Sequence, residues 1–155
     1  MKLDLSSLAG AVSQLEESLW YSHSEAAQSD PKLFRQFRNS AVQCFEFTYE
    51  LCWKMLKRRL ELDAPSPASL DSLGFRDLFR LGAEQGLVGD PVRWFGYRER
   101  RNETSHVYDE AKAEQVYETA VAFLDDARRL LQELERRNSR STQGRAAGPG
   151  GGRGP

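Results

Sequence analysis

The residues best suited to chemistry lie in one short stretch, Arg101 to Tyr108, of a chain that has only two histidines. As a helix, this stretch places Asn102 and His106 four residues apart on one face. Arg101, Ser105 and Tyr108 follow at spacings of four and three on a neighbouring stripe. An arginine, a histidine and a tyrosine are therefore expected to converge on one small region.

This combination suits the cleavage of RNA by its own 2′-hydroxyl without a metal ion. An arginine fork binds phosphate or the charge that develops on a phosphorane, and a histidine moves protons near neutral pH. The nearby Arg98 adds positive charge to the region. An arginine and a histidine five residues apart also occur on ordinary solvated helix faces, so spacing alone leaves both interpretations open.

Composition limits the partners that the chain can bind. Its 155 residues suit one domain, and a net charge of -1 with 29% charged residues provides no overall basic field. Contact with nucleic acid is therefore expected to be local. Cys44 and Cys52 lie in an apolar helical pattern and are expected to be free thiols in a reducing cytoplasm.

Several common functional motifs are missing from the sequence. It contains no glycine-rich phosphate loop, no paired-aspartate metal motif, no clustered zinc ligands and no dinucleotide-binding fingerprint. We expect no bound metal or cofactor, and any ATP chemistry should belong to a partner. The N-terminus does not resemble a signal peptide and no apolar run approaches the ~20 residues of a membrane span, so a cytoplasmic protein without membrane contact is expected.

Hydrophobic periodicity predicts helices throughout and no strand. Asp30-Pro31 and Asp90-Pro91 are helix-start signals, with a capping aspartate before a proline, and Gly86 is suited to ending a helix. The polar segment from Ser22 to Asp30 is expected to be a loop with an exposed His23. The predicted helices cover residues 5–21, 31–63, 72–85, 91–108 and 110–138.

These helices predict an all-α fold, an up-and-down four-helix bundle with one extra short helix. The bundle is expected to occupy residues 1–138, followed by a disordered tail rich in Gly, Pro and Arg over residues 139–155. The apolar arc of the long helix is wider than one core requires, which fits either a second subunit or a central position in a single chain. On its polar stripe, Glu46, Glu50 and Lys54 form an i,i+4 ladder worth only ~0.3 kcal/mol per pair.

Two stretches of the chain, Phe45–Lys54 and Arg101–Glu110, resemble the HEPN superfamily in sequence and in order. The resemblance is greatest to the nucleotidyltransferase substrate-binding proteins, which are akin to the HepT toxins of the HepT/MntA type. It covers residues 3–137 and implies a helical-bundle homodimer that forms a complex with a cognate minimal nucleotidyltransferase.

In the toxin branch, the Arg-x4-His-x-Tyr pattern is a ribonuclease site built where two subunits meet, and the partner neutralises it by attaching AMP to the tyrosine. The resemblance implies that Arg101 stabilises the phosphorane and that His106 is the general acid or base. Asn102 would orient the phosphate or the imidazole, and Tyr108 would accept AMP. RNA would be the substrate. Supporting roles are expected for four further residues: Arg98, Ser105, Glu46 and Glu50.

Two other functions remain open at this point. The chain could be a non-catalytic subunit that binds a nucleotide or another substrate for the nucleotidyltransferase. It could also be an interaction module in which Arg98 or Arg101 forms structural ion pairs with Glu46 or Glu50. Whether the chain is an enzyme, a metal-independent endoribonuclease, is left open by the sequence. An arginine and a histidine that face solvent in a cleft shared by two subunits would favour a functional site, and residues sealed inside one subunit would favour ion pairs.

Overall fold

The computed structural model describes residues 2–106 and 108–146, with side chains described as far as residue 140. Every regular element in these ranges is helical, which confirms the all-α prediction. In chain order the elements are α1 (Ser6–Ser22), α2 (Glu25–Ser29), α3 (Pro31–Asp63), η1 (Pro67–Leu70), α4 (Phe75–Glu84), α5 (Pro91–Asn102), η2 (Thr104–His106) and α6 (Glu110–Ala146).

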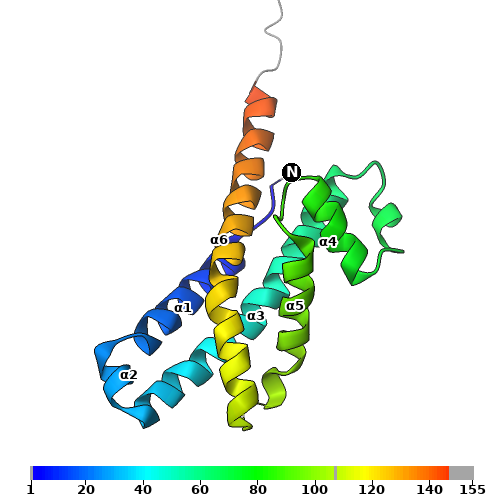
Figure 1. The fold of residues 1–155 in the computed structure, drawn as a ribbon. Coiled ribbons are helices and arrows are strands. Elements are labelled where there is room, and N and C mark those ends of the chain that lie inside the picture. The colour runs from blue at the N-terminus through cyan, green and yellow to red at the C-terminus, as the bar shows by residue number, and fades with distance from the viewer. Residues whose placement is uncertain (1, 107, 147–155) are drawn as a thin grey trace, which may run out of the picture.

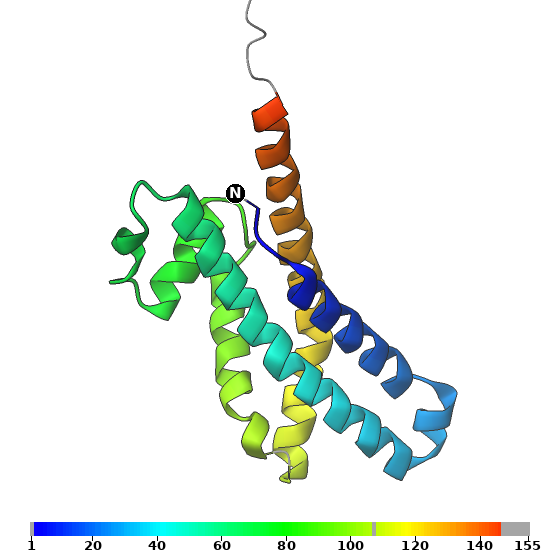
Figure 2. The same ribbon diagram turned by 180° about the vertical axis from the view of Figure 1, so that it is seen from behind.

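The helices form a bundle around the long helix α3 (Figures 1 and 2). α1 lies along α3, α6 contacts both of them, and α5 packs against α3 and α6. α4 and η1 lie near the C-terminal end of α3, whereas the turn between α5 and α6 lies at the opposite end of the molecule (Figure 1). α3 contacts both α5 and α6, the two helices that this turn connects.

The predicted helix starts are confirmed at both Asp-Pro pairs. The Asp30 carboxylate accepts hydrogen bonds from the backbone N–H groups of Lys32 and Leu33, and Asp90 accepts one from Val92. These contacts satisfy N–H groups that the first turn of a helix otherwise leaves unpaired. Asp90 thus fixes the start of α5, the helix that carries Arg98, Arg101 and Asn102.

The end of α4 is also where the sequence predicts it. Gly86 has φ +76° and is the only described residue with a positive φ. Its N–H donates to the Ala83 carbonyl at 3.0 Å, and the Leu87 N–H donates to the Gly82 carbonyl at 2.8 Å. This pair of bonds closes the helix through a left-handed residue, a conformation that favours glycine.

Four predicted boundaries differ from the structure, the first being the start of α4, which is expected at residue 72 and lies at Phe75. The expected loop after α1 contains the short helix α2, because the Ser24 hydroxyl caps it by accepting from the Ala27 N–H. The helix expected to run to Tyr108 ends at Asn102. α6 continues to Ala146, past the predicted end at Asn138, and residues 147–155 of the predicted tail lie outside the described residues.

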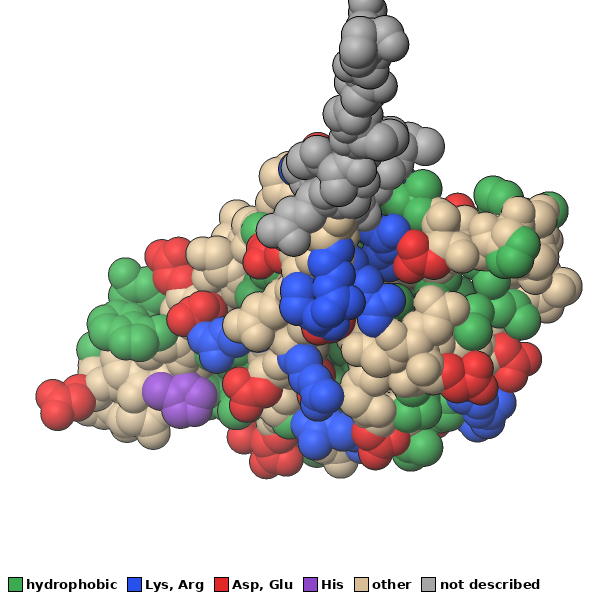
Figure 3. Space-filling view, turned by 90° about the horizontal axis from the view of Figure 1, so that it is seen from above, with side chains coloured by type: hydrophobic (Ala, Val, Ile, Leu, Met, Phe, Trp, Pro, Cys, Tyr) green, Lys and Arg blue, Asp and Glu red, His purple; other side chains and the backbone are tan. Residues whose placement is uncertain are grey.

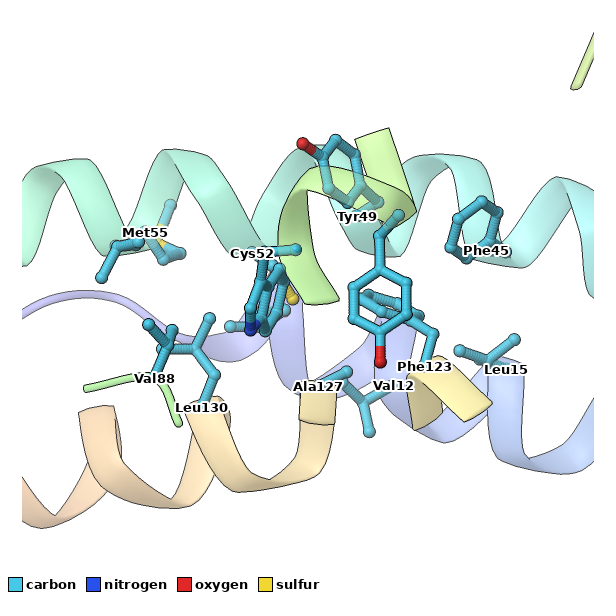
Figure 4. Packing of buried hydrophobic residues seen from close by; sticks show 14 of the residues in the cluster. Val12, Leu15, Phe45, Tyr49, Cys52, Met55, Val88, Phe123, Ala127 and Leu130 are labelled. Atoms are coloured by element: carbon cyan, nitrogen blue, oxygen red, sulfur yellow. The ribbon is translucent and has the colours of Figure 1, made fainter. Parts of the chain in front are cut away.

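Aromatic side chains join the three helices at the centre of the core. Phe123 of α6 makes edge-on contacts with Phe45 of α3 and with Trp94 and Tyr97 of α5, at centroid distances of 5.0 to 5.6 Å. Figure 4 shows Phe45 projecting from α3 towards Phe123. The contacts fix α5 against α3 and α6, which positions the end of α5.

Neighbours within one chain bury most of the wide apolar arc of α3. Its buried residues face α1, α5 and α6, and Phe47 is the large hydrophobic residue that remains exposed near its centre. Cys44 and Cys52 are buried free thiols, as predicted, and burial raises the pKa of Cys52. The central position in a single chain therefore accounts for much of the arc.

None of the helices in the described part of the chain is long and apolar enough to span a membrane. Seen from above, Lys and Arg side chains gather beside the C-terminal end of α6, with Asp and Glu side chains around them (Figure 3). Positive charge on this face is thus local and interrupted by negative charge.

Candidate functional site

The chain changes direction immediately after Asn102, in the middle of the chemically rich stretch. The Glu103 N–H donates to the Arg100 carbonyl at 3.0 Å, and the Thr104 hydroxyl donates to the Arg101 carbonyl at 2.8 Å. A side-chain bond of this kind competes with continued helix. The predicted continuous helix through Tyr108 is therefore wrong, and the expected helical face shared by Asn102 and His106 does not exist.

Arg101 lies against the long helix. The Arg101 Nε is 2.8 Å from Glu50 Oε1, and the Arg101 Nη2 is 3.9 Å from Glu46 Oε1. The Nε–Glu50 contact is an ion pair that lacks the alignment of a hydrogen bond. The Arg101 side chain is 33% exposed, so it is held by α3 and yet remains accessible.

Glu50 holds a second side chain as well. The indole N–H of Trp53 donates to Glu50 Oε2 at 3.0 Å, while the other carboxylate oxygen faces Arg101. One carboxylate thus sets the positions of a guanidinium and an aromatic ring. Glu50 thus contacts Trp53 and Arg101, which are not members of the i,i+4 ladder of Glu46, Glu50 and Lys54 expected from the sequence.

His106 and Tyr108 form a pair in the turn that follows. His106 Nδ1 lies 3.3 Å from the Tyr108 hydroxyl oxygen, within hydrogen-bond distance. The Tyr108 side chain is 81% exposed and His106 is partly exposed. The imidazole can therefore exchange protons with a bound group, and the phenol is open to a large reaction partner.

Buried Arg38 anchors the start of α6, directly after this turn. Its guanidinium donates to Glu110 at 2.9 Å, and Arg35 lies 3.5 Å from the same carboxylate. These hydrogen bonds and charges lower the pKa of Glu110 below its ordinary value. Asp109 caps the helix by accepting from the Ala111 N–H. The C-terminal end of the turn with His106 and Tyr108 is therefore held against α3 by Arg35 and Arg38.

The remaining predicted residues lie at different places around the turn. Arg100 contacts Glu103, directly after α5, at 3.0 Å and Gln115 of α6 at 3.3 Å, so the two adjacent arginines have different neighbours. Asn102 is exposed. Ser105 is exposed and forms none of the side-chain hydrogen bonds found among the described residues.

A pocket of about 310 Å³ opens beside Arg101, between α3, η1, α4 and α5. It brings together four residues expected at the site from the sequence: Glu50, Arg98, Arg101 and Asn102. It is also lined by residues that sequence reasoning did not assign to a site: Tyr49, Trp53, Lys57, Leu70, Leu73, Gly74, Phe75 and Leu78. Glu46, Ser105, His106 and Tyr108 do not line it.

A sequence signal for part of this pocket did exist. Glu46, Glu50, Trp53 and Lys57 recur at spacings of four, three and four, which places them on one face of α3. Trp53 interrupts an otherwise charged stripe, and an aromatic residue on a polar face indicates a contact. What the contact is depends on α4 and α5, which no spacing within α3 reveals.

Arg101 and His106 are both accessible, and neither is sealed inside the subunit. In the described part of the chain, no group of three or more His, Cys, Asp or Glu side chains is arranged to hold a metal ion. The arrangement offers a positive group fixed by carboxylates and an imidazole in reach of solvent. These are the elements of phosphate binding and proton transfer.

Comparisons with known proteins identify the family of the chain. Residues 3–136 match the family described as nucleotidyltransferase substrate binding protein like. A Haemophilus influenzae protein named probable ribonuclease HepT is 38% identical over 132 residues, which cover 85% of this chain and 87% of that protein.

Solved structures share the fold. One from Haemophilus influenzae, described as the fold of a substrate binding domain of a nucleotidyltransferase, matches with a TM-score of 0.76 and 34% identity. The match covers 85% of this chain and 99% of that one. A crystal structure of a protein from Thermus thermophilus matches with a TM-score of 0.63 and 25% identity, over 82% and 98% of the two chains.

Proposed function

Since the chain belongs to the HepT-like nucleotidyltransferase substrate-binding protein family of the HEPN superfamily, we propose that it is a ribonuclease controlled by a partner nucleotidyltransferase. The observation that carries the proposal is the geometry of the motif residues. Arg101 is fixed by Glu50 and stays accessible, and His106 lies partly exposed in the adjoining turn. The name of the HepT relative supports ribonuclease activity.

In the proposed reaction, the 2′-hydroxyl of RNA attacks the adjacent phosphorus and displaces the 5′-oxygen of the next nucleotide. His106 accepts the proton of the 2′-hydroxyl or donates one to the leaving oxygen. Arg101 stabilises the negative charge on the non-bridging oxygens, since a guanidinium is always charged and matches phosphate geometry. Asn102, next to Arg101 and exposed, orients the phosphate. These steps need no metal ion.

The test is cleavage of single-stranded RNA by the purified protein in EDTA. We expect His106→Ala to lower kcat/KM by about 10²- to 10⁴-fold, the usual contribution of a general acid or base. Arg101→Ala should cost about 10²- to 10³-fold, because a charge-stabilising group is lost.

Matched controls come from the same side-chain types elsewhere. His23 is exposed, and its Nδ1 lies 2.7 Å from the Leu19 carbonyl, so His23→Ala should cleave like the wild type. Arg128 of α6 pairs with Glu16 at 2.8 Å, and Arg128→Ala should likewise keep activity. Wild-type protein that cleaves no RNA, or a fully active His106→Ala variant, would contradict the proposal.

Regulation is proposed to act at Tyr108. Its phenol is exposed and lies 3.3 Å from His106, so an AMP group on it would displace that contact and place a negative phosphodiester beside the imidazole. The modified site would then exclude RNA by occupancy and by charge. The nucleotide would be supplied by the active site of the partner, which brings the metal-bound ATP.

Tyr108→Phe removes the acceptor oxygen and keeps the ring. With the cognate nucleotidyltransferase and ATP, we expect the wild type to gain the mass of one AMP and lose cleavage, while Tyr108→Phe keeps its mass and its activity. Tyr21→Phe, at another exposed tyrosine, should be modified and inactivated like the wild type. Intact-protein mass spectrometry provides the measurement, and AMP transfer to Tyr108→Phe would show that the acceptor lies elsewhere.

A second function is favoured by the pocket itself. A cavity of about 310 Å³ beside two arginines can hold a small phosphorylated ligand, as a non-catalytic substrate-binding subunit requires. The description of the Haemophilus influenzae structure as a substrate binding domain supports this alternative. It predicts binding of a nucleotide without cleavage of RNA, which the same EDTA assay distinguishes.

A further inference from the structure

The pocket beside Arg101 contains a buried hydroxyl without a partner. Tyr49 is only 1% exposed, and its hydroxyl oxygen is buried and forms no hydrogen bond with any described residue. The residue lines the pocket, and its hydroxyl points away from Ala127 and Leu130 of α6 (Figure 4). A buried polar group without a partner destabilises the fold, so a ligand atom that pairs with it would remove that cost.

This hydroxyl is a neutral hydrogen-bonding group. Burial raises the pKa of Tyr49, although the charges of Arg98 and Arg101 partly oppose the rise. The Tyr49 hydroxyl is therefore protonated near neutral pH, and it can donate or accept a hydrogen bond. Asn102, at the rim of the same pocket, offers a carboxamide with both functions. Two neutral groups of this kind suit the edge of a nucleobase, which presents donors and acceptors together.

The pocket also has aromatic walls. Trp53 and Phe75 are partly buried, line the pocket and pack against the core. The Trp53 ring is held in place by its bond to Glu50, and the Arg98 guanidinium lies 4.1 Å from the centroid of Phe75. Flat aromatic rings and guanidinium planes are the surfaces on which unpaired bases stack.

Charge at the pocket favours a phosphorylated ligand. Three basic side chains line it, Arg98, Arg101 and Lys57, against the single carboxylate of Glu50. Arg98 has no carboxylate within ion-pair distance among the described residues, so its charge is not neutralised by the protein. A base inserted between the aromatic walls would leave its phosphate near Arg101, where the proposed cleavage takes place.

From these observations we infer that the pocket is a nucleobase subsite, which takes one base of a nucleotide whose phosphate lies at Arg101. The base stacks against Trp53 and hydrogen-bonds to the Tyr49 hydroxyl. The inference deepens the proposed function: in a ribonuclease, the subsite selects the nucleotide beside the cleaved bond. The same chemistry would hold a free mononucleotide, so the two sources must be separated by experiment.

The experiment measures binding by calorimetry with three probes. These are AMP, ribose 5-phosphate, and a single-stranded 2′-O-methyl RNA tetranucleotide, which cannot be cleaved because its nucleophile is blocked. Tyr49→Phe should weaken binding of AMP or the tetranucleotide roughly 3- to 10-fold through one lost hydrogen bond. Trp53→Leu should weaken it on the order of 10- to 100-fold through lost stacking. Ribose 5-phosphate lacks a base and should bind all variants alike.

Matched controls separate binding from folding. The Tyr117 hydroxyl, 2.7 Å from Ser22, is buried and hydrogen-bonded away from the pocket. Tyr117→Phe should therefore lower the melting temperature and leave binding unchanged. Tyr49→Phe should instead weaken binding and raise the melting temperature, because it removes a buried hydroxyl without a partner. Trp20, exposed on α1, provides the control Trp20→Leu.

Each result bears on the inference separately from the proposed function. Binding of the tetranucleotide alone assigns the subsite to RNA, and binding of AMP alone assigns it to a mononucleotide. Both outcomes support the inference if Tyr49→Phe weakens binding, even where the wild type cleaves no RNA and the proposed function fails. The inference would be overturned by wild-type protein that binds neither AMP nor the tetranucleotide. It would also be overturned by Tyr49→Phe and Trp53→Leu variants that bind these probes as tightly as the wild type.

Discussion

At the residue scale, the contacts of Glu50 explain how an arginine on one helix is kept in a fixed position. The carboxylate lies between the Arg101 guanidinium at 2.8 Å and the Trp53 indole N–H at 3.0 Å. A flexible arginine loses side-chain entropy when it binds phosphate, and an arginine that is already held loses less. We therefore propose that Glu50 is a positioning residue, which would act on the proposed reaction through Arg101.

Glu50→Gln tests this role. The amide oxygen can still accept from Trp53, but the charge that holds Arg101 is lost. We expect kcat for RNA cleavage to fall roughly tenfold through misplacement of Arg101. The free energy of unfolding should change by less than about 1 kcal/mol, because the ion pair is partly exposed.

The double variant Glu50→Gln/Arg101→Ala provides the control. If Glu50 acts only through Arg101, the double variant should be no less active than Arg101→Ala alone, since the two effects are coupled. Independent, multiplying losses of kcat would contradict a positioning role.

Adjacent residues of one helix differ in role at this scale. Arg100 pairs with Glu103 and Gln115 towards α6, whereas Arg101 pairs with Glu50 and Glu46 on α3. The helix turns by about 100° per residue, so neighbours in sequence face different elements. The sequence shows several arginines together, and only the packing of α5 assigns each one a partner.

At the scale of elements, the turn between α5 and α6 is held at both ends. The Thr104 hydroxyl closes the end of α5 on the Arg101 carbonyl, and Arg38 of α3 holds the start of α6 through Glu110. These anchors fix the turn that carries His106 and Tyr108 while leaving both side chains accessible. An exposed segment can thus keep a defined geometry.

The Arg38–Glu110 contact predicts a pH dependence of stability. Arg38 lowers the pKa of Glu110 from its ordinary value of 4.5. A carboxylate whose pKa is lowered by folding contributes stability that is complete above the unfolded value and is lost as the pH falls through the folded value. Glu110→Gln should therefore melt below the wild type at pH 7, and the difference should shrink as the pH falls below 4.5.

Thermal melts between pH 7 and pH 3 provide the measurement. Glu84, an exposed carboxylate at the end of α4, is the matched control, and Glu84→Gln should melt like the wild type throughout. A Glu110→Gln variant whose melting temperature stays equally far below the wild type at every pH would show that the ionised carboxylate is not what stabilises the start of α6.

At the scale of the whole molecule, we propose that two chains associate and that the nucleotidyltransferase binds this dimer. The resemblance implies a site built where two subunits meet, and a symmetric dimer would carry two such sites, related by its two-fold axis. Exposed apolar side chains are available for contact, among them Phe47, Val92 and Val121.

Mixing two inactive variants tests this arrangement. If Arg101 of one chain acts with His106 of its partner, each heterodimer of Arg101→Ala and His106→Ala regains one intact site. Random mixing makes about half of the dimers heterodimers, and each heterodimer has one intact site out of two. It would therefore restore about a quarter of wild-type activity. Light scattering of the wild type should give twice the 17.6 kDa of the chain.

The outcomes of the mixing experiment are distinct. Heterodimers that form without regaining activity would place Arg101 and His106 of each site in the same chain. A mass of 17.6 kDa at assay concentration would contradict the dimer itself. The mixing experiment applies only if the wild type cleaves RNA, whereas the mass measurement tests the dimer whether or not the protein is a ribonuclease.

The sequence by itself determined the helical class, most helix positions and the family. Helix periodicity and Asp-Pro starts are local signals, which is why α3 begins at Pro31 and ends at Asp63 as predicted. The motif around Arg101 and His106 is also local, since its residues lie within eight positions of one another. Each of these features depends on neighbours in the chain, so residue order is enough to reveal it.

Only the tertiary structure decided how those residues are arranged. The end of α5 at Asn102 depends on the Thr104 hydroxyl, which could equally have faced solvent. The contact of Arg38 with Glu110 joins residues 72 positions apart, and the pocket around Tyr49 exists only because α4 and α5 pack against α3. Such contacts depend on the packing of whole helices, because side chains from distant segments meet only after the core has formed.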